Sequence, residues 1–211
     1  GFAKITTASD PVLSRITEGL GDTYSVMDIY FKPYTACRHT HGAAQAALEL
    51  SAGETFDLAQ VENITVHTYG IAELAVGKGV DATSSFVSAQ FSIPYVVAAC
   101  LVDGELGPGQ LTEKRIADPA LLDLAARVMV TTDEELNKCY PDKTSSRVEI
   151  LFKDGRRLSR QVDDPKVRGV TREIESLETV RRLEVERLLL AVPDLVKSLK
   201  LTEEGFLAQL E

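Results

Sequence analysis

The sequence predicts an α+β domain, in which helices accompany an antiparallel sheet, followed by further helices at the C-terminus. The strongest local signal lies in residues 146–163, where two alternating runs flank Asp154-Gly155, a dipeptide that favours hairpin turns. Helices and strands alternate only loosely along the 211 residues, which favours α+β over a parallel α/β sheet. A content of 44% hydrophobic and 26% charged residues is typical of a globular protein with a substantial core.

The N-terminal elements are predicted from apolar spacing and from residues that begin helices. Residues 10–20 have the apolar spacing of a helix, with Asp10 as its N-cap and Pro11 in its first turn. Residues 24–32 alternate and are rich in β-forming side chains, so they predict a strand. The alanine-rich stretch 41–50 predicts a helix.

The middle of the chain continues with alternating elements. Residues 61–69 alternate as a strand does, and residues 94–103 predict a helix with Ser92 as its N-cap. Residues 119–127 predict another helix, which leads into a strand at 128–132. These segments supply the strands and helices of the predicted α+β domain.

The C-terminal part of the chain is predicted to be helical. Residues 171–190 form a charged amphipathic pattern, and shorter helical patterns follow at 193–200 and 202–210. The change from mixed to helical sequence places a boundary near residues 164–170.

Charge and composition exclude several classes of function. The chain has 23 basic and 32 acidic residues, a net charge of −9 and a pI of about 5.0, so nucleic acid is a poor partner. Residues 93–102 are the longest apolar run, which is too short to span a bilayer. Three widely spaced cysteines do not suggest a disulfide framework and favour a reducing cytoplasm: Cys37, Cys100 and Cys139.

No motif indicates a cofactor. The sequence lacks the glycine-rich patterns of nucleotide-binding loops, the G-x-S-x-G of serine hydrolases and the paired spacings of a zinc site. We therefore expect no metal and no organic cofactor.

The densest cluster of chemically active side chains lies in residues 32–41. This segment contains lysine, tyrosine, cysteine, arginine and two histidines, at the start of the predicted alanine-rich helix. A helix N-terminus attracts anions, and Lys32 and Arg38 add positive charge, so the segment predicts a carboxylate or phosphate pocket. His39 and His41 are two residues apart and would face different directions on a helix, so at most one of them is expected to point at a substrate.

A second candidate segment is residues 90–95. Ser92 and Tyr95 lie at a predicted helix start, where both hydroxyls could reach an anion, and Tyr95 could also relay a proton. The alternative is that Ser92 only caps the helix and that Tyr95 belongs to the core. Capping or surface positions are likewise an open alternative for each residue of 32–41 taken singly. His67, on a predicted strand, is expected to be an ordinary surface or core residue.

These two segments resemble the MmgE/PrpD family, which includes 2-methylcitrate dehydratase, cis-aconitate decarboxylase and iminodisuccinate epimerase. The segment FKPYTACRHTHGAAQAALEL is similar to the first signature of the family, and FSIPYVVAACLVDG is similar to its second. The resemblance extends over roughly residues 25–167. After Lys166 the sequence departs from the family, which usually continues with glycine, proline and asparagine.

The resemblance implies a domain organisation. Residues 1–22 would be a helical lead-in from an upstream helical domain, residues 23–167 the α+β lid domain, and residues 168–211 helices that follow the lid. The chain would then be the C-terminal part of a longer enzyme, and the family suggests a homodimer.

The resemblance also implies roles for individual residues in cofactor-free proton abstraction next to a carboxylate. Substrate carboxylates would be bound by Lys32, Arg38, His39 and Ser92, and His41 and Tyr95 would be the catalytic residues. Cys37 would form the pocket wall. It stands where some relatives have an active-site histidine, so decarboxylation is less favoured.

The resulting prediction is a lyase or isomerase, of dehydratase or epimerase type, that acts on a small di- or tricarboxylate. Two alternatives stay open. The chain alone could be an inactive lid fragment, or it could be a regulatory module that binds a carboxylate without turning it over.

Overall fold

The computed structural model describes residues 12, 14, 18–19, 29–53 and 56–169. The chain divides into two compact units, residues 32–167 and residues 1–31 with 168–211. In the latter unit, the short strands β1 (Tyr30–Phe31) and β6 (Arg168–Gly169) pair antiparallel. Several predicted elements lie wholly or mostly outside the described residues, namely those at 10–20, 24–32, 171–190, 193–200 and 202–210.

The larger unit contains a four-stranded sheet in the order β3-β2-β4-β5. Its strands are β2 (Val61–Thr68), β3 (Val128–Thr132), β4 (Ser146–Phe152) and β5 (Arg157–Val162). The pairs β2–β4 and β4–β5 are antiparallel, and β2–β3 is parallel. The expectation of an antiparallel sheet is therefore wrong at β3. The reason is the long helical segment between β2 and β3, which lets the chain cross over and return in the same direction.

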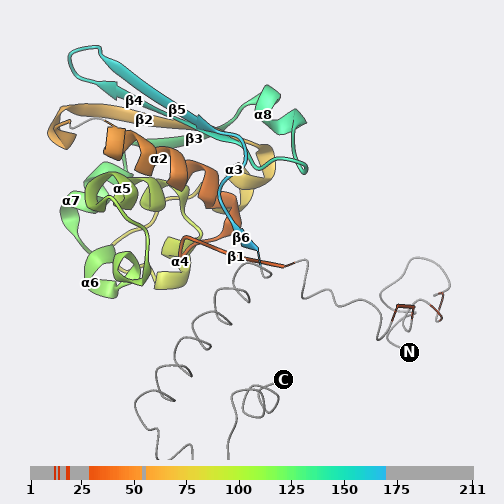
Figure 1. Ribbon diagram of the computed structural model, residues 1–211. Helices are drawn as coiled ribbons and strands as arrows, with labels where there is room; N and C mark the ends of the chain where they lie inside the picture. The colour runs from red at the N-terminus through yellow and green to blue at the C-terminus, as the bar shows by residue number, and fades with distance from the viewer. Residues whose placement is uncertain (1–11, 13, 15–17, 20–28, 54–55, 170–211) are drawn as a thin grey trace, which may run out of the picture. The chain divides into compact units, whose positions relative to one another are not determined.

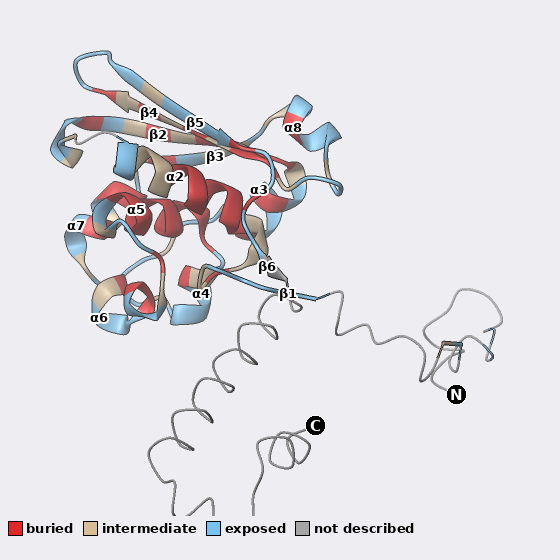
Figure 2. Ribbon diagram, in the orientation of Figure 1, coloured by how far each residue is buried: buried red, intermediate tan, exposed pale blue. Residues whose placement is uncertain are grey.

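Two long helices cover one face of this sheet (Figure 1). They are α2 (His41–Gly53) and α5 (Ile93–Asp103), and α5 also packs against α7 (Pro119–Ala125). Figure 2 shows that buried residues are concentrated along α2 and α5 and on the strands. Strand β4 alternates buried and half-buried residues, so one of its faces contributes to the core between the sheet and the helices. This arrangement confirms the α+β class.

Local sequence explains the two long helices. Ser92 caps α5 by accepting a hydrogen bond from the backbone N–H of Tyr95, and Gly104 ends the helix with φ +68°. Helix α2 approaches the sheet closely at Gly42, where a Cβ atom would lie 2.8 Å from Oγ of Ser146. Small side chains at the start of α2 therefore allow the packing that positions the candidate site.

The remaining helices are short connections. The helix predicted over 119–127 is confirmed as α7, two residues shorter than expected. Helices of four or five residues were not predicted, because they are about as short as the repeat that reveals a helix. The short helices are α3 (Gly70–Val76), α4 (Phe86–Gln90), α6 (Glu113–Ile116) and α8 (Glu134–Lys138), with 3-10 turns η3 (Arg38–Thr40), η4 (Leu58–Gln60) and η5 (Pro108–Leu111). In the described part of the chain, no helix has the length and apolar character needed to cross a bilayer.

Candidate functional site

The two candidate segments meet in the folded domain. The backbone N–H of Cys37 donates to the carbonyl oxygen of Gln90 at 3.0 Å, which fixes the start of η3 beside the end of α4. At this junction lies an open cavity of about 360 Å³. Its lining residues are Lys32, Tyr34, Thr35, Ala36, Cys37, Gln90 and Phe91. The cavity is small enough to suit an organic acid of a few carbon atoms.

The electrostatics of this cavity favour an anion. Lys32 is the charged residue of the lining, and within the part of the chain that the structure describes its ammonium makes no ion pair. The hydroxyls of Tyr34 and Thr35 and the amide of Gln90 add hydrogen-bonding groups. Burial raises the pKa of Tyr34, so its hydroxyl is protonated at neutral pH and can donate. No lining residue is acidic.

Arg38 follows Cys37 in the sequence but does not line the cavity, and it holds the segment that follows β5. Its guanidinium donates to the carbonyl oxygens of Pro165, at 2.9 Å, and Lys166, at 3.4 Å. The Asp164 carboxylate lies 3.7 Å from the same guanidinium. Arg38 therefore joins the first motif to residues 164–166, a connection of more than one hundred residues in sequence.

His41 is enclosed between the first motif and α2. Nε2 lies 3.3 Å from the Ala36 carbonyl oxygen, and Nδ1 lies 3.5 Å from the Arg38 guanidinium. A guanidinium can only donate, so Nδ1 accepts and the proton of the neutral ring is on Nε2. The Tyr34 ring meets the imidazole edge-on, with centroids 5.2 Å apart. Burial, the largest cause, and the positive charges of Arg38 and Lys32 together lower the pKa of His41 to about 4.

His39 faces a different environment from His41. Its Nδ1 lies 2.8 Å from the hydroxyl of Tyr69, whose ring stacks on that of Tyr140 at 4.6 Å. Burial lowers the pKa of His39 as well, so it is neutral at physiological pH. The two histidines thus contact separate groups, and neither lines the cavity.

Ser92 and Tyr95 are both buried at the start of α5. The Ser92 hydroxyl accepts the Tyr95 N–H, and the Tyr95 hydroxyl donates to the Gln110 carbonyl oxygen. Burial raises the pKa of Tyr95 to about 12, so this phenol is neutral near physiological pH. Both hydroxyls therefore have partners inside the domain, and neither residue lines the cavity.

The cavity thus brings together two of the predicted site residues, Lys32 and Cys37. Sequence reasoning did not single out the other polar lining residues, although each lay within or next to a motif. Tyr34 and Thr35 belong to the first motif, and Gln90 is the first residue of the second candidate segment. Their position beside the predicted site residues was the signal from which they could have been found. The roles predicted for Arg38, His39, His41, Ser92 and Tyr95 stay predictions.

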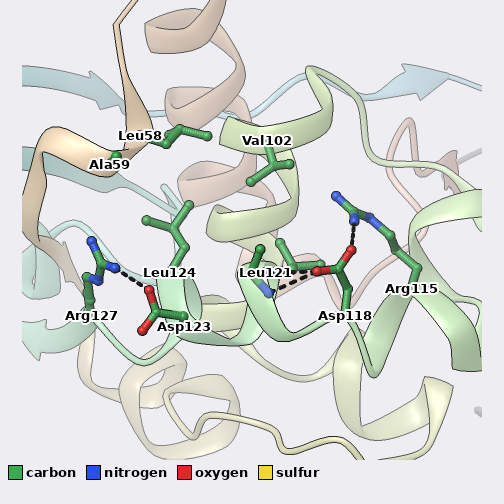
Figure 3. Close-up of a pocket in the computed structure, with 10 residues that line it drawn as sticks. Leu58, Ala59, Val102, Arg115, Asp118, Leu121, Asp123, Leu124 and Arg127 are labelled. Atoms are coloured by element: carbon green, nitrogen blue, oxygen red, sulfur yellow. Dashed lines mark hydrogen bonds and ion pairs between the residues drawn. The ribbon is translucent and has the colours of Figure 1, made fainter.

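A second, larger cavity of about 440 Å³ lies between η4, α5 and α7 (Figure 3). Its apolar lining includes Leu121 and Leu124. Its two arginines are already paired, Arg115 with Asp103 and Asp118, and Arg127 with Asp123. These carboxylates neutralise the arginines, so this cavity suits an anionic substrate less well than the first. Among the residues described, no group of three or more potential ligand side chains is placed to hold a metal ion.

A mixed sheet covered by helices, with the two motifs meeting at a cavity whose charged lining residue is Lys32, defines a domain of α+β type. The chain belongs to the MmgE/PrpD family, since the family model of the MmgE/PrpD C-terminal domain matches residues 34–181.

Two curated relatives are cis-aconitate decarboxylase sequences from Aspergillus terreus. They are 27% and 26% identical to this chain over 160 residues, which is 72% of this chain and 32% of each relative. The aligned region thus spans about a third of the length of these relatives. This membership places the chain in a family of lyase-type enzymes.

Proposed function

We propose that the protein takes part in cofactor-independent acid–base chemistry on a small di- or tricarboxylate, as a lyase or isomerase of dehydratase or epimerase type. The observation that carries the proposal is the Lys32 ammonium in a cavity that contains hydroxyls, an amide and no carboxylate. Membership of the MmgE/PrpD family supports the reaction class.

The proposed chemistry follows from the charges at this site. A proton next to a carboxylate becomes acidic only if the negative charge that develops on the resulting enolate is stabilised. Lys32 would bind one substrate carboxylate directly, with Tyr34 and Thr35 as hydrogen-bond donors. Arg38, which follows Cys37 in the sequence, adds positive charge that the Asp164 carboxylate partly offsets. The site would therefore stabilise the additional negative charge that develops on the enolate during proton abstraction.

His41 and Tyr95 are the predicted proton-transfer groups. Their burial and internal hydrogen bonds favour a supporting role: His41 holds Arg38, and Tyr95 holds the η5 segment through Gln110. In the proposed enzyme, further acid–base groups would lie in a region that corresponds to the part of the relatives outside the alignments. Cys37, in place of a histidine, favours dehydration or epimerisation over decarboxylation.

The proposal also covers the cellular location and the oligomeric state of the protein. We propose a cytoplasmic homodimer, which the family resemblance implies. All three cysteines of the chain are free thiols, and free thiols are typical of a reducing compartment.

A second candidate is carboxylate binding without turnover by this chain alone, as in a lid fragment or a regulatory module. This candidate is favoured because the alignments cover only about a third of the length of the relatives.

The deciding experiment follows protons next to carboxylates. The chain, and any longer product of its gene, is incubated in D₂O with citrate, 2-methylcitrate, cis-aconitate or iminodisuccinate, and proton NMR records exchange and new products. Exchange or turnover by the 211-residue chain would exclude the binding-only alternative. Binding by both proteins, with no exchange in either, would refute the enzymatic proposal.

The role of Lys32 is tested by Lys32→Gln, with Lys78→Gln as a charge-matched control at an exposed loop position. We expect the first change to weaken carboxylate binding about tenfold or more, since it removes a charge-assisted hydrogen bond. The control should bind as the wild type does. Equal affinities of all three proteins would refute the assignment of this cavity.

A further inference from the structure

The three cysteines occupy three different environments. Cys37 is half-buried and lines the cavity, Cys100 is buried in α5, and Cys139 is exposed at the end of α8. Cys37 stands at the N-cap of η3, yet its side chain makes no capping hydrogen bond. Its thiol is therefore available to a molecule that enters the cavity.

The two accessible thiols have different charged neighbours. Lys32 shares the cavity with Cys37, and no acidic residue belongs to the lining. Cys139 follows Glu134, Glu135 and Lys138, and Lys138 is paired with Glu135, so the charges beside this thiol are mixed. Cys100 is a third case, since burial raises the pKa of its thiol and keeps it protonated. An anionic reagent should thus be concentrated more strongly near Cys37 than near Cys139.

We propose that Cys37 is a site of covalent modification selective for electrophiles that carry a carboxylate. Lys32 binds the carboxylate, and the thiolate attacks the adjacent electrophilic carbon. The natural class would be an α,β-unsaturated carboxylate. This choice rests on the proposed function, because elimination next to a carboxylate generates such compounds.

The chemistry balances without an oxidant or a further reactant. The sulfur of Cys37 forms a bond to the β-carbon, and the electron pair of the double bond moves to the α-carbon. The α-carbon takes a proton from water, and the proton lost by the thiol passes to solvent. The product is a stable thioether that places a carboxylate in the cavity, so the modification would block the binding of further acids.

The test compares two alkylating reagents that differ in charge. The 211-residue chain is treated with equal amounts of iodoacetate and isotopically distinct iodoacetamide, and mass spectrometry of its peptides gives the ratio of the two products at each cysteine. In this reaction sulfur displaces iodide, so turnover is not needed. We expect the iodoacetate fraction at Cys37 to exceed that at Cys139 about threefold or more, because of the local positive charge.

Two substitutions test whether Lys32 causes the preference of Cys37 for the anionic reagent. Lys32→Gln should abolish the preference at Cys37, whereas Lys78→Gln should retain it. Acrylate and acrylamide, compared in the same way, extend the test to unsaturated acceptors. A preference that survives Lys32→Gln, or a Cys37 that reacts no more with iodoacetate than Cys139 does, would overturn the proposal.

The result of the labelling experiment can be distinguished from the result of the proton-exchange experiment that tests the proposed function. Selective labelling of Cys37, together with carboxylate binding but no proton exchange by either the chain or any longer product of its gene, would support the modification site and refute the enzymatic proposal. Turnover without selective labelling would refute only the modification site.

Discussion

Acidification should destabilise the domain through His41. The imidazole has no exposed surface and is neutral, with its Nε2–H directed at Ala36 and its Nδ1 at Arg38. Protonation would place a second positive charge against the Arg38 guanidinium in a site without a neighbouring carboxylate among its closest partners. Folding is therefore linked to the neutral form of this ring.

The sign and size of the effect follow from the two pKa values. Burial lowers the pKa of His41 from 6.5 to about 4 in the folded state. The stabilisation is fully present above the unfolded value and is lost as the pH falls from 6.5 towards 4, because the unfolded chain binds the proton first. Each unit of difference is worth about 1.4 kcal/mol, so the limit is about 3 kcal/mol. Solvent screening at the exposed Lys32 reduces this figure.

The assay is urea unfolding followed by circular dichroism, which suits a chain without tryptophan. His41→Gln retains an amide N–H for the Ala36 carbonyl but cannot titrate. The free energy of unfolding of wild type, minus that of His41→Gln, should fall as the pH is lowered across this range. A pH-independent difference for His41→Gln would refute the reasoning.

Two further predictions concern packing and buried hydrogen bonds. Gly42→Ala should destabilise the domain by about 1–3 kcal/mol, because the new methyl meets Ser146 at 2.8 Å, as measured by thermal unfolding. Gly53→Ala, in the same helix with open space around it, should be neutral or stabilising, and equal effects of the two changes would contradict the packing argument. Tyr95→Phe should cost about 1–3 kcal/mol in denaturant unfolding, because the buried carbonyl of Gln110 loses its donor, and an unchanged midpoint would show that this hydrogen bond is not needed.

Local elements could be predicted wherever the determining residues are close in sequence. The Ser92 cap, Pro94 and Gly104 together define α5, and the alternation of residues 61–69 defines β2. The loop at Asp154-Gly155 was also correct, since Gly155 adopts φ +86° between β4 and β5. In each case a capping bond, a turn or a period of two fixes the structure over a few residues.

The direction of β3 could not be predicted in this way. Its sequence, VMVTT, predicts a strand, and the structure confirms the strand over Val128–Thr132. Its parallel pairing with β2 depends on where the helices between them return the chain. Strand residues carry no signal for the direction of their neighbour, so the sheet was wrongly expected to be antiparallel throughout.

The candidate site likewise has features that the sequence predicts and features that it does not. The sequence identified both motifs and predicted that His39 and His41 would face different directions. Which side chains line the cavity was not predictable, because that depends on the contact between Cys37 and Gln90, fifty-three positions apart.

The sequence by itself determined the family, the α+β class, the main helices and strands and the two motifs of the site. Only the tertiary structure decided that Lys32 and Cys37 share a cavity, that His41 and Tyr95 are enclosed, and that Arg38 holds residues 164–166. The physical reason is the separation in sequence between the residues that interact. Caps, turns and periodicity act between residues a few positions apart, whereas burial and the partner of a side chain are set by segments that meet only when the whole domain packs.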